Sequence, residues 1–122
     1  MSRARTWAPV LLWSLGLFCL SSLPGSSFPS VSVPSADKLV HLALYSVLGA
    51  LCARALRRSS RLRGAPAILV AAAVATLYGA SDEIHQLFVR GRSAELADVA
   101  ADGVGGLLGA AAFAVVFRQG RT

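Results

Sequence analysis

Residues 64–81, GAPAILVAAAVATLYGAS, carry no charged side chain, and this stretch decides the class of protein. Residues 7–35 and 103–117 are also free of charge. With its flanks, each stretch is close to or above the roughly 18 apolar residues that a helix needs to cross a bilayer. Hydrophobic residues make up 55% of the 122-residue chain and charged residues only 15%. The sequence therefore predicts a membrane protein rather than a soluble domain.

The apolar segments predict an all-α polytopic membrane protein, with four transmembrane helices in a small bundle. The predicted spans are residues 7–23, 37–56, 66–85 and 96–117. The Gly/Ser/Pro-rich residues 24–34 cannot be helical throughout, so we expect a loop there. Arg3 and Arg5 precede the first span, so a cleaved signal peptide is the alternative for that segment. If it were cleaved, the bundle would have three spans.

Charge is distributed unevenly along this predicted topology. Nine of the twelve basic residues fall on one side: Arg3, Arg5, Arg54, Arg57, Arg58, Arg61, Arg63, Arg118 and Arg121. The other side holds Lys38, Arg90, Arg92 and all six acidic residues. Because basic loops stay in the cytoplasm, we expect a multi-pass membrane protein with both termini cytoplasmic. The basic residues lie in short loops and at span ends, which argues against a nucleic-acid partner.

The same arrangement gathers polar side chains from three spans at the outer end of the bundle. Asp37, His41 and Tyr45 follow one another at helical i, i+4, i+8 spacing. Two further stripes contain Tyr78, Asp82 and His85 or Gln86, and Asp98 with Asp102. A carboxylate at membrane depth is costly, so we expect these groups to face each other or water. Simpler roles stay open: Asp37 at a helix N-terminus, His41 in packing, and the tyrosines at the membrane interface.

The residue types in this layer allow several chemistries. Imidazole and carboxylate groups can be tuned to opposite protonation states, which suits general acid–base catalysis. They can also hold a divalent metal, but the spacing gives only a weak metal signal, so the metal and any cofactor stay unknown. Lys38 and Arg92 could hold a phosphate.

At these residues the chain resembles the VanZ-like family of bacterial membrane proteins. The matching stretches are DKLVHLALYSVLG at residues 37–49, YGASDEIHQLFVRGRS at residues 78–93, and Asp98 with the glycine-rich residues from Gly103. The resemblance implies one VanZ-like domain. It divides into residues 1–36, a span and its extracytoplasmic loop, and residues 37–122, a three-helix membrane region.

The resemblance implies a set of candidate site residues. The candidate catalytic residues are His41, Glu83, Asp98 and Asp37. The candidate substrate-binding residues from the resemblance are Lys38, Gln86 and Arg92. Helical spacing in the same polar layer adds Tyr45, Asp102 and His85. Two positions depart from the family pattern: Arg90 stands where the family usually has Pro, and Asp102 where it usually has Asn. The first should loosen a turn, and the second adds negative charge to the pocket.

The function that the resemblance implies is action on a lipid head group or a lipid-linked, phosphate-bearing envelope precursor at the outer leaflet. A link to glycopeptide (teicoplanin) resistance follows from the family by analogy only. The alternative is a non-catalytic protein that binds an envelope lipid, a glycopeptide or a membrane partner, so catalysis stays open. An ion-coupled role is less favoured, because the carboxylates cluster at one end. We expect membrane lipids as partners and leave a homo-oligomer open. Ala101, Gly105 and Gly109 form its candidate interface, although this row could equally pack within the chain.

Overall fold

The computed structural model describes residues 2–28 and 36–118, and all regular structure in these ranges is helical. Its four long helices are α1 (Arg3–Ser21), α2 (Ala36–Ser59), α3 (Gly64–Gln86) and α4 (Leu96–Arg118). A 3-10 turn at Gly25–Ser27 follows α1. The all-α prediction is confirmed, and each helix lies within a few residues of its predicted span. The other residues of the predicted 24–34 loop, from 29 onward, lie outside the described residues, as do Arg121 and the rest of 119–122.

Three of the four helices, α2, α3 and α4, are long and apolar enough to cross a membrane. Helix α1 has 19 residues but does not meet this criterion. Its first turn contains Arg3 and Arg5, and charged residues oppose insertion into hydrocarbon. The prediction of four spans is therefore supported for three helices only.

Helices α2 and α4 pack closely because glycines bring their backbones together. A Cβ atom added at Gly105 would lie 2.4 Å from the Leu42 carbonyl oxygen, and one at Gly109 would lie 1.8 Å from that of Ser46. Such close approach is typical of small-residue rows in membrane helices. Gly105 and Gly109, two members of the row predicted from the sequence, therefore face α2 within the same chain.

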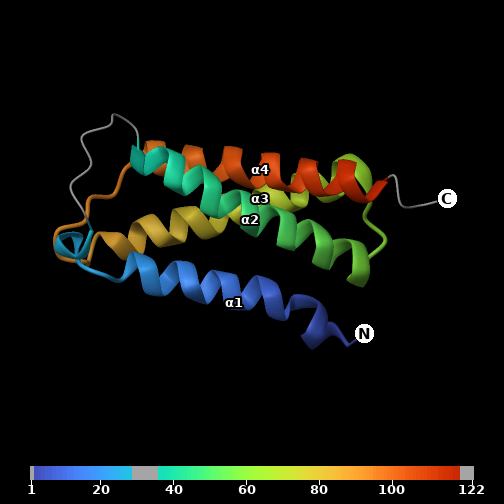
Figure 1. The fold of residues 1–122 in the computed structure, drawn as a ribbon, viewed down its shortest axis with the longest axis horizontal. Coiled ribbons are helices and arrows are strands. Elements are labelled where there is room, and N and C mark those ends of the chain that lie inside the picture. Colours follow the sequence, from blue (N-terminus) through green and yellow to red (C-terminus); the bar gives the residue numbers. More distant parts are fainter. Residues whose placement is uncertain (1, 29–35, 119–122) are drawn as a thin grey trace.

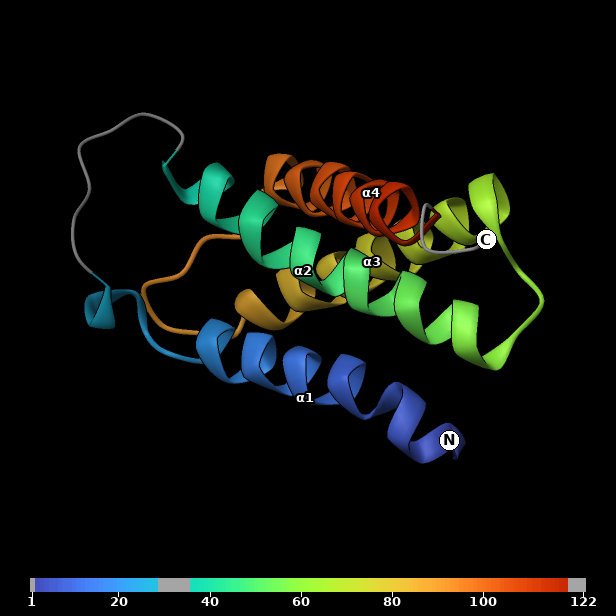
Figure 2. The same cartoon turned by 45° about the vertical axis from the view of Figure 1, so that its right-hand side comes forward.

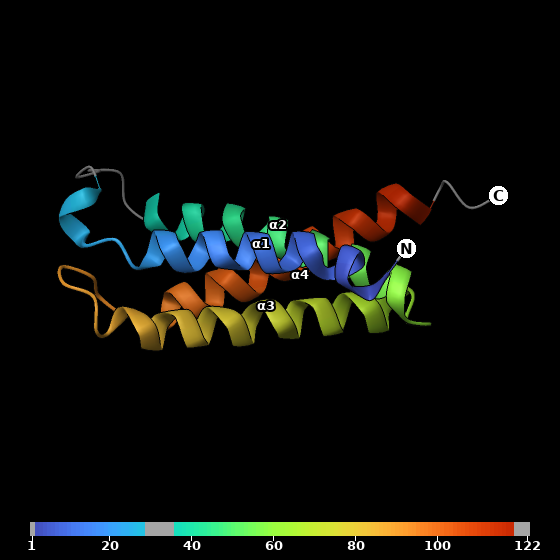
Figure 3. The same cartoon turned by 90° about the horizontal axis from the view of Figure 1, so that it is seen from below.

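Helix α1 lies against α2 and α3 and does not contact α4 among the described residues. Two polar contacts hold it in place. The Trp13 indole nitrogen donates to the Leu44 carbonyl oxygen at 2.9 Å, and the Tyr78 hydroxyl donates to the Ser14 carbonyl oxygen. A hydrogen bond of this kind contributes about 0.5–1.5 kcal/mol. Figure 3 shows α1 in front of the bundle, with α2 above it and α3 below it.

The two ends of the bundle differ in charge. Figure 1 shows the start of α1, the end of α4 and the α2–α3 connection at one end, where basic residues gather. The α3–α4 connection and the 3-10 turn lie together at the other end, as Figure 2 shows. There the Gly25 amide donates to the Arg90 carbonyl oxygen at 3.0 Å, and Gly91 adopts a positive φ of 73°. All six acidic residues lie toward this second end.

Large apolar side chains remain exposed along the helices. Leu77 is 71% exposed, Val116 65% and Leu12 68%. A soluble monomer rarely exposes apolar surface on this scale. The exposed faces fit contact with lipid.

Candidate functional site

Four buried carboxylates form the centre of the polar end. Asp82 and Glu83 come from α3, and Asp98 and Asp102 come from α4; none is more than 7% exposed. Burying an ionised carboxylate is costly unless it is paired or hydrogen-bonded. Four buried carboxylates in one layer are unusual where side chains serve only packing. These carboxylates form the centre of the candidate site.

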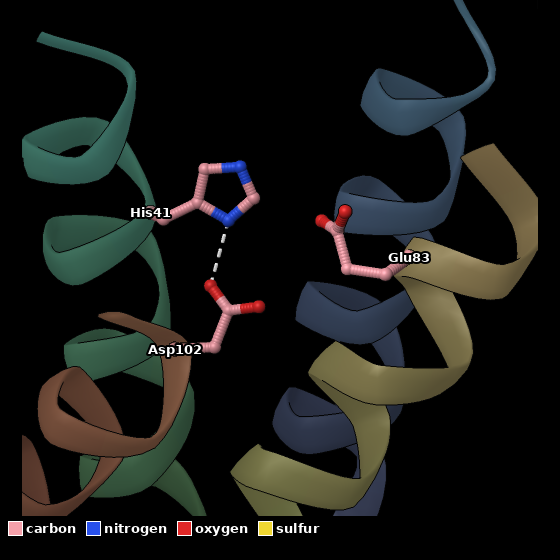
Figure 4. Close-up of side chains that lie close together, drawn as sticks. All are labelled: His41, Glu83 and Asp102. Atoms are coloured by element: carbon pink, nitrogen blue, oxygen red, sulfur yellow. Dashed lines mark hydrogen bonds and ion pairs between the residues drawn. The ribbon is translucent and has the colours of Figure 1, made fainter. Parts of the chain in front are cut away.

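His41 on α2 lies between two of these carboxylates. Its Nδ1 is 2.7 Å from Asp102 Oδ1, and its Nε2 is 3.8 Å from Asp98 Oδ2. Figure 4 shows the hydrogen bond between the ring and Asp102, with Glu83 facing the same space from α3. A carboxylate that accepts from one ring nitrogen fixes the orientation of the imidazole and leaves the other nitrogen for chemistry.

Asp102 is fully buried because Gly79 of α3, which has no side chain, leaves space for its carboxylate. A Cβ atom added at Gly79 would lie 2.4 Å from Asp102 Oδ2, so any larger residue at that position would collide with this carboxylate. Gly79 is the residue after Tyr78 and was not part of the predicted α3 stripe. The sequence alone gave no reason to pair it with Asp102.

Glu83 connects α3 to the start of α4. Its Oε2 accepts a hydrogen bond from the Glu95 amide at 2.9 Å, one residue before Leu96 begins α4. Its second oxygen, Oε1, has no hydrogen-bond partner among the described residues. Glu83 therefore links α3 to the start of α4 and keeps one acceptor oxygen without a partner among the described residues.

Lys38 is surrounded by carboxylates. Its Nζ lies 2.6 Å from Asp37 and 3.1 Å from Asp98, and it also contacts Glu95. The sequence predicted this ammonium group as a phosphate ligand. In the structure it neutralises acidic side chains from α2 and the start of α4.

A cavity of about 510 Å³ opens beside His41. Its apolar wall comes from α1 and α2 and includes Leu17, Leu20, Val40 and Leu44. Its polar lining comes from all four helices and the α3–α4 connection: Ser21, Asp37, His41, Tyr45, Asp82, Gln86, Arg92, Ser93 and Asp98. One space thus combines an apolar wall with charged groups, as an amphipathic ligand requires.

The structure brings most of the predicted site residues together. Six line the cavity: Asp37, His41, Tyr45, Gln86, Arg92 and Asp98. Lys38, Glu83 and Asp102 lie next to it; Lys38 and Asp102 contact its lining residues directly. His85 faces α1 instead, where its Nε2 is 2.8 Å from Ser22 Oγ and its ring stacks on Phe18 at 4.6 Å. The two histidines therefore do not share a pocket.

Arg92 carries the guanidinium group of the cavity. It lies 4.6 Å from the centre of the Phe28 ring and donates to the Leu23 carbonyl oxygen at 3.4 Å. These contacts hold it between the end of α1 and the α3–α4 connection. A planar guanidinium in this position suits a phosphate or carboxylate ligand.

The site also contains residues that were not among the predicted candidates. Asp82 lines the cavity and is buried. Its position one helical turn after Tyr78, in the same stripe, could have identified it as a site residue. The α1 residues Leu17, Leu20 and Ser21 gave no such signal, because the contact partners of α1 cannot be found from its own composition.

Two groups of side chains have the donor types and spacing for a metal ion. The first is His41, Glu83 and Asp102, and the second is Asp37, Glu95 and Asp98. Within each group the potential ligand atoms lie within 4.8 Å of one another. The first group is more buried and contains an imidazole, whereas the second already surrounds Lys38.

Comparison with known proteins identifies one family. The family model described as VanZ/LLP1 matches residues 5–118, which include all four helices except the first residues of α1. No curated protein and no solved structure matches this chain.

Proposed function

This chain belongs to the VanZ/LLP1 family, and on that premise we propose that it acts on phosphate-bearing head groups of membrane lipids or lipid-linked envelope precursors. The reaction takes place in the cavity beside His41. The protein is a multi-pass component of the bacterial cell membrane. The link to glycopeptide resistance stays a prediction by family analogy.

The amphipathic cavity is the observation that carries this proposal. Leu17, Leu20 and Leu44 offer an apolar wall to an acyl or prenyl chain, and Arg92 and Gln86 lie at the polar part of the same space. A ligand with a long apolar chain and a phosphate fits both parts. A small water-soluble ligand would leave the apolar wall unused.

His41 is the proposed acid of the reaction. Its Nδ1 faces Asp102 and its Nε2 lies on the side of Asp98, which lines the cavity with it. An incoming hydroxyl oxygen bonds to phosphorus while the bond from phosphorus to the leaving oxygen breaks. Asp98 accepts the proton of the hydroxyl, and His41 gives the proton of Nε2 to the leaving oxygen.

The proposed topology has four spans, with both termini in the cytoplasm and the polar layer at the outer leaflet. Helix α1 supports this as a fourth span, because Leu11, Leu12 and Leu15 are exposed on it while Val10 and Leu17 are buried. The concentration of arginines at the opposite end supports the orientation.

Phosphorus NMR on the purified chain tests the reaction. The protein is placed in nanodiscs that contain phosphatidylglycerol, phosphatidylethanolamine and a polyprenyl-phosphate-linked sugar. We expect the phosphorus signal of at least one lipid to be replaced by that of its product. His41→Gln removes the proposed acid and should abolish this conversion.

His85→Gln is the matched control, because this histidine lies at the same end of the bundle but faces Ser22 and Phe18. It should retain conversion. If no lipid is converted while one of them binds with Arg92-dependent affinity, the non-catalytic alternative replaces the enzyme proposal. If the protein neither converts nor binds any of them, the proposed substrate class is wrong.

A further inference from the structure

The polar end contains more buried negative charge than its cations balance. Four carboxylates, those of Asp82, Glu83, Asp98 and Asp102, are buried there. The ion pairs of this layer are made by Lys38 and His41, and Lys38 is shared among three carboxylates. Such an excess requires either protonation or a further cation.

Glu83 and Asp102 each have one buried carboxylate oxygen without a hydrogen-bond partner. Asp102 is 0% exposed and Glu83 is 6% exposed. Asp102 Oδ2 and Glu83 Oε1 have no hydrogen-bond partner among the described residues. Buried polar atoms are nearly always paired, so two unpaired acceptors in one place indicate a missing positive or donor group.

His41 completes this arrangement from a third helix. Potential ligand atoms of His41, Glu83 and Asp102 lie within 4.8 Å of one another. Figure 4 shows the imidazole and both carboxylates around one shared space, approached from α2, α3 and α4. Two ligand atoms that share one metal ion at about 2.0–2.2 Å lie roughly 3–4 Å apart, so small rotations of these side chains bring them around one ion.

From this geometry we propose that His41, Glu83 and Asp102 bind one divalent transition-metal ion. One imidazole and two carboxylates suit Mn²⁺ or Zn²⁺, whereas Mg²⁺ and Ca²⁺ prefer oxygen ligands alone. Gly79 leaves the room in which Asp102 takes this position. The three ligands leave further coordination positions for water or a ligand oxygen.

The cation site does not depend on the proposed substrate, but the two fit together. An anionic phosphate would be repelled by a pocket with an excess of carboxylates, and a divalent cation reverses that local charge. Ligation through Nδ1 keeps the hydrogen of His41 on Nε2. That N–H donates a hydrogen bond to the cavity but does not give up its proton, so the acid role proposed for His41 belongs to the metal-free protein.

Manganese binding to the full chain tests the proposal. The protein, without a polyhistidine tag and in phosphatidylcholine nanodiscs, is titrated with Mn²⁺ while electron paramagnetic resonance measures the free ion. We expect one Mn²⁺ per chain and its displacement by Zn²⁺. Glu83→Gln and Asp102→Asn should each weaken binding at least about 10-fold, as loss of a group that supports a metal site does.

Glu95→Gln is the control, because Glu95 belongs to the second, more exposed acidic group. It should leave the affinity within about two-fold of the parent. Thermal unfolding of each variant checks folding, and Mn²⁺ should raise the unfolding temperature of the parent protein.

The proposal is overturned if the folded parent binds neither Mn²⁺ nor Zn²⁺ at millimolar concentration. It is also overturned if Glu95→Gln weakens binding as much as Asp102→Asn does. Conversion of lipid phosphorus in a protein that binds no metal would overturn the cation site and leave the proposed function standing. Metal binding without lipid conversion or lipid binding would overturn the proposed function and leave the cation site standing.

Discussion

Two neighbouring tyrosines in the bundle differ in the hydrogen bonding of their hydroxyl groups. The rings of Tyr45 and Tyr78 lie 6.3 Å apart between centroids. The Tyr78 hydroxyl donates to the Ser14 carbonyl oxygen. Tyr45 is one of the residues that line the cavity, and its buried hydroxyl has no partner among the described residues. A buried hydroxyl without a hydrogen-bond partner lowers the free energy of unfolding, and a bound ligand can supply the missing partner.

Removing each hydroxyl should therefore have opposite consequences. Tyr45→Phe should keep or raise the free energy of unfolding, because no hydrogen bond is lost, and should weaken binding of the phosphate lipid. Tyr78→Phe should lower the free energy of unfolding by about 0.5–1.5 kcal/mol and leave lipid binding unchanged. Thermal unfolding and lipid titration of both variants measure this. Loss of stability in Tyr45→Phe with unchanged lipid binding would assign Tyr45 to packing instead.

For a single side chain, the sequence could not distinguish between two adjacent residues of one helix. The α3 stripe allowed either His85 or Gln86 to face the pocket, because adjacent helical residues point about 100° apart. In the structure Gln86 lines the cavity and His85 faces α1. Lys38 was expected to be available for phosphate, but its three carboxylate partners come partly from α4 and the residue before it. Such long-range neighbours are not visible in a local pattern.

Close packing of α2 on α4 sets the relative positions of the helices that carry His41 and Asp102. The contact runs through Gly105 and Gly109, where the α4 backbone meets carbonyl oxygens of α2. This close approach keeps the imidazole of α2 within hydrogen-bond distance of the α4 carboxylate. The glycine row could be predicted from the sequence, although the helix that it faces could not.

Gly109→Ala should lower stability, since the added methyl group would lie 1.8 Å from the Ser46 carbonyl oxygen. Alanine is the better helix former by about 1 kcal/mol, so the loss must come from packing. We expect a net loss of about 1–3 kcal/mol in the free energy of unfolding, as for other overpacked sites. Denaturation of the purified protein in detergent measures it.

Gly16→Ala in α1 is the matched control, because a Cβ atom there meets nothing within 4 Å. It should be neutral or stabilising. Equal stability of both variants would contradict the close α2–α4 contact.

Across the whole molecule, the bundle separates charge between its ends. Both ends of the chain and the arginine-rich α2–α3 connection lie at one end, and the acidic residues lie toward the other (Figure 1). This separation was predicted correctly, because it requires only helix boundaries and an up-and-down order. A polar pocket at the acidic end was also predicted, but its apolar wall was not, since that wall depends on how α1 packs on α2 and α3.

Cysteine labelling in intact cells tests the proposed orientation. In a Cys19→Ala/Cys52→Ala background, single cysteines replace Ser27, Ser93 or Ser60. Ser27 and Ser93 are exposed at the acidic end, and Ser60 follows α2 at the basic end. We expect an impermeant maleimide to label positions 27 and 93 and not 60. Labelling of position 60 alone would invert the topology and move the site to the cytoplasmic side.

Photo-crosslinking of lipids from inside the cavity tests the central claim most directly. A diazirine amino acid replaces either Leu44, which lines the cavity, or Leu77, which is 71% exposed on the outer face of α3. Mass spectrometry then identifies the lipids attached in native membranes. The account predicts that one class of phosphate-bearing lipid is enriched at position 44 over position 77, and that Arg92→Gln removes this enrichment. The same mixture of lipids at both positions would contradict a head-group site in the cavity.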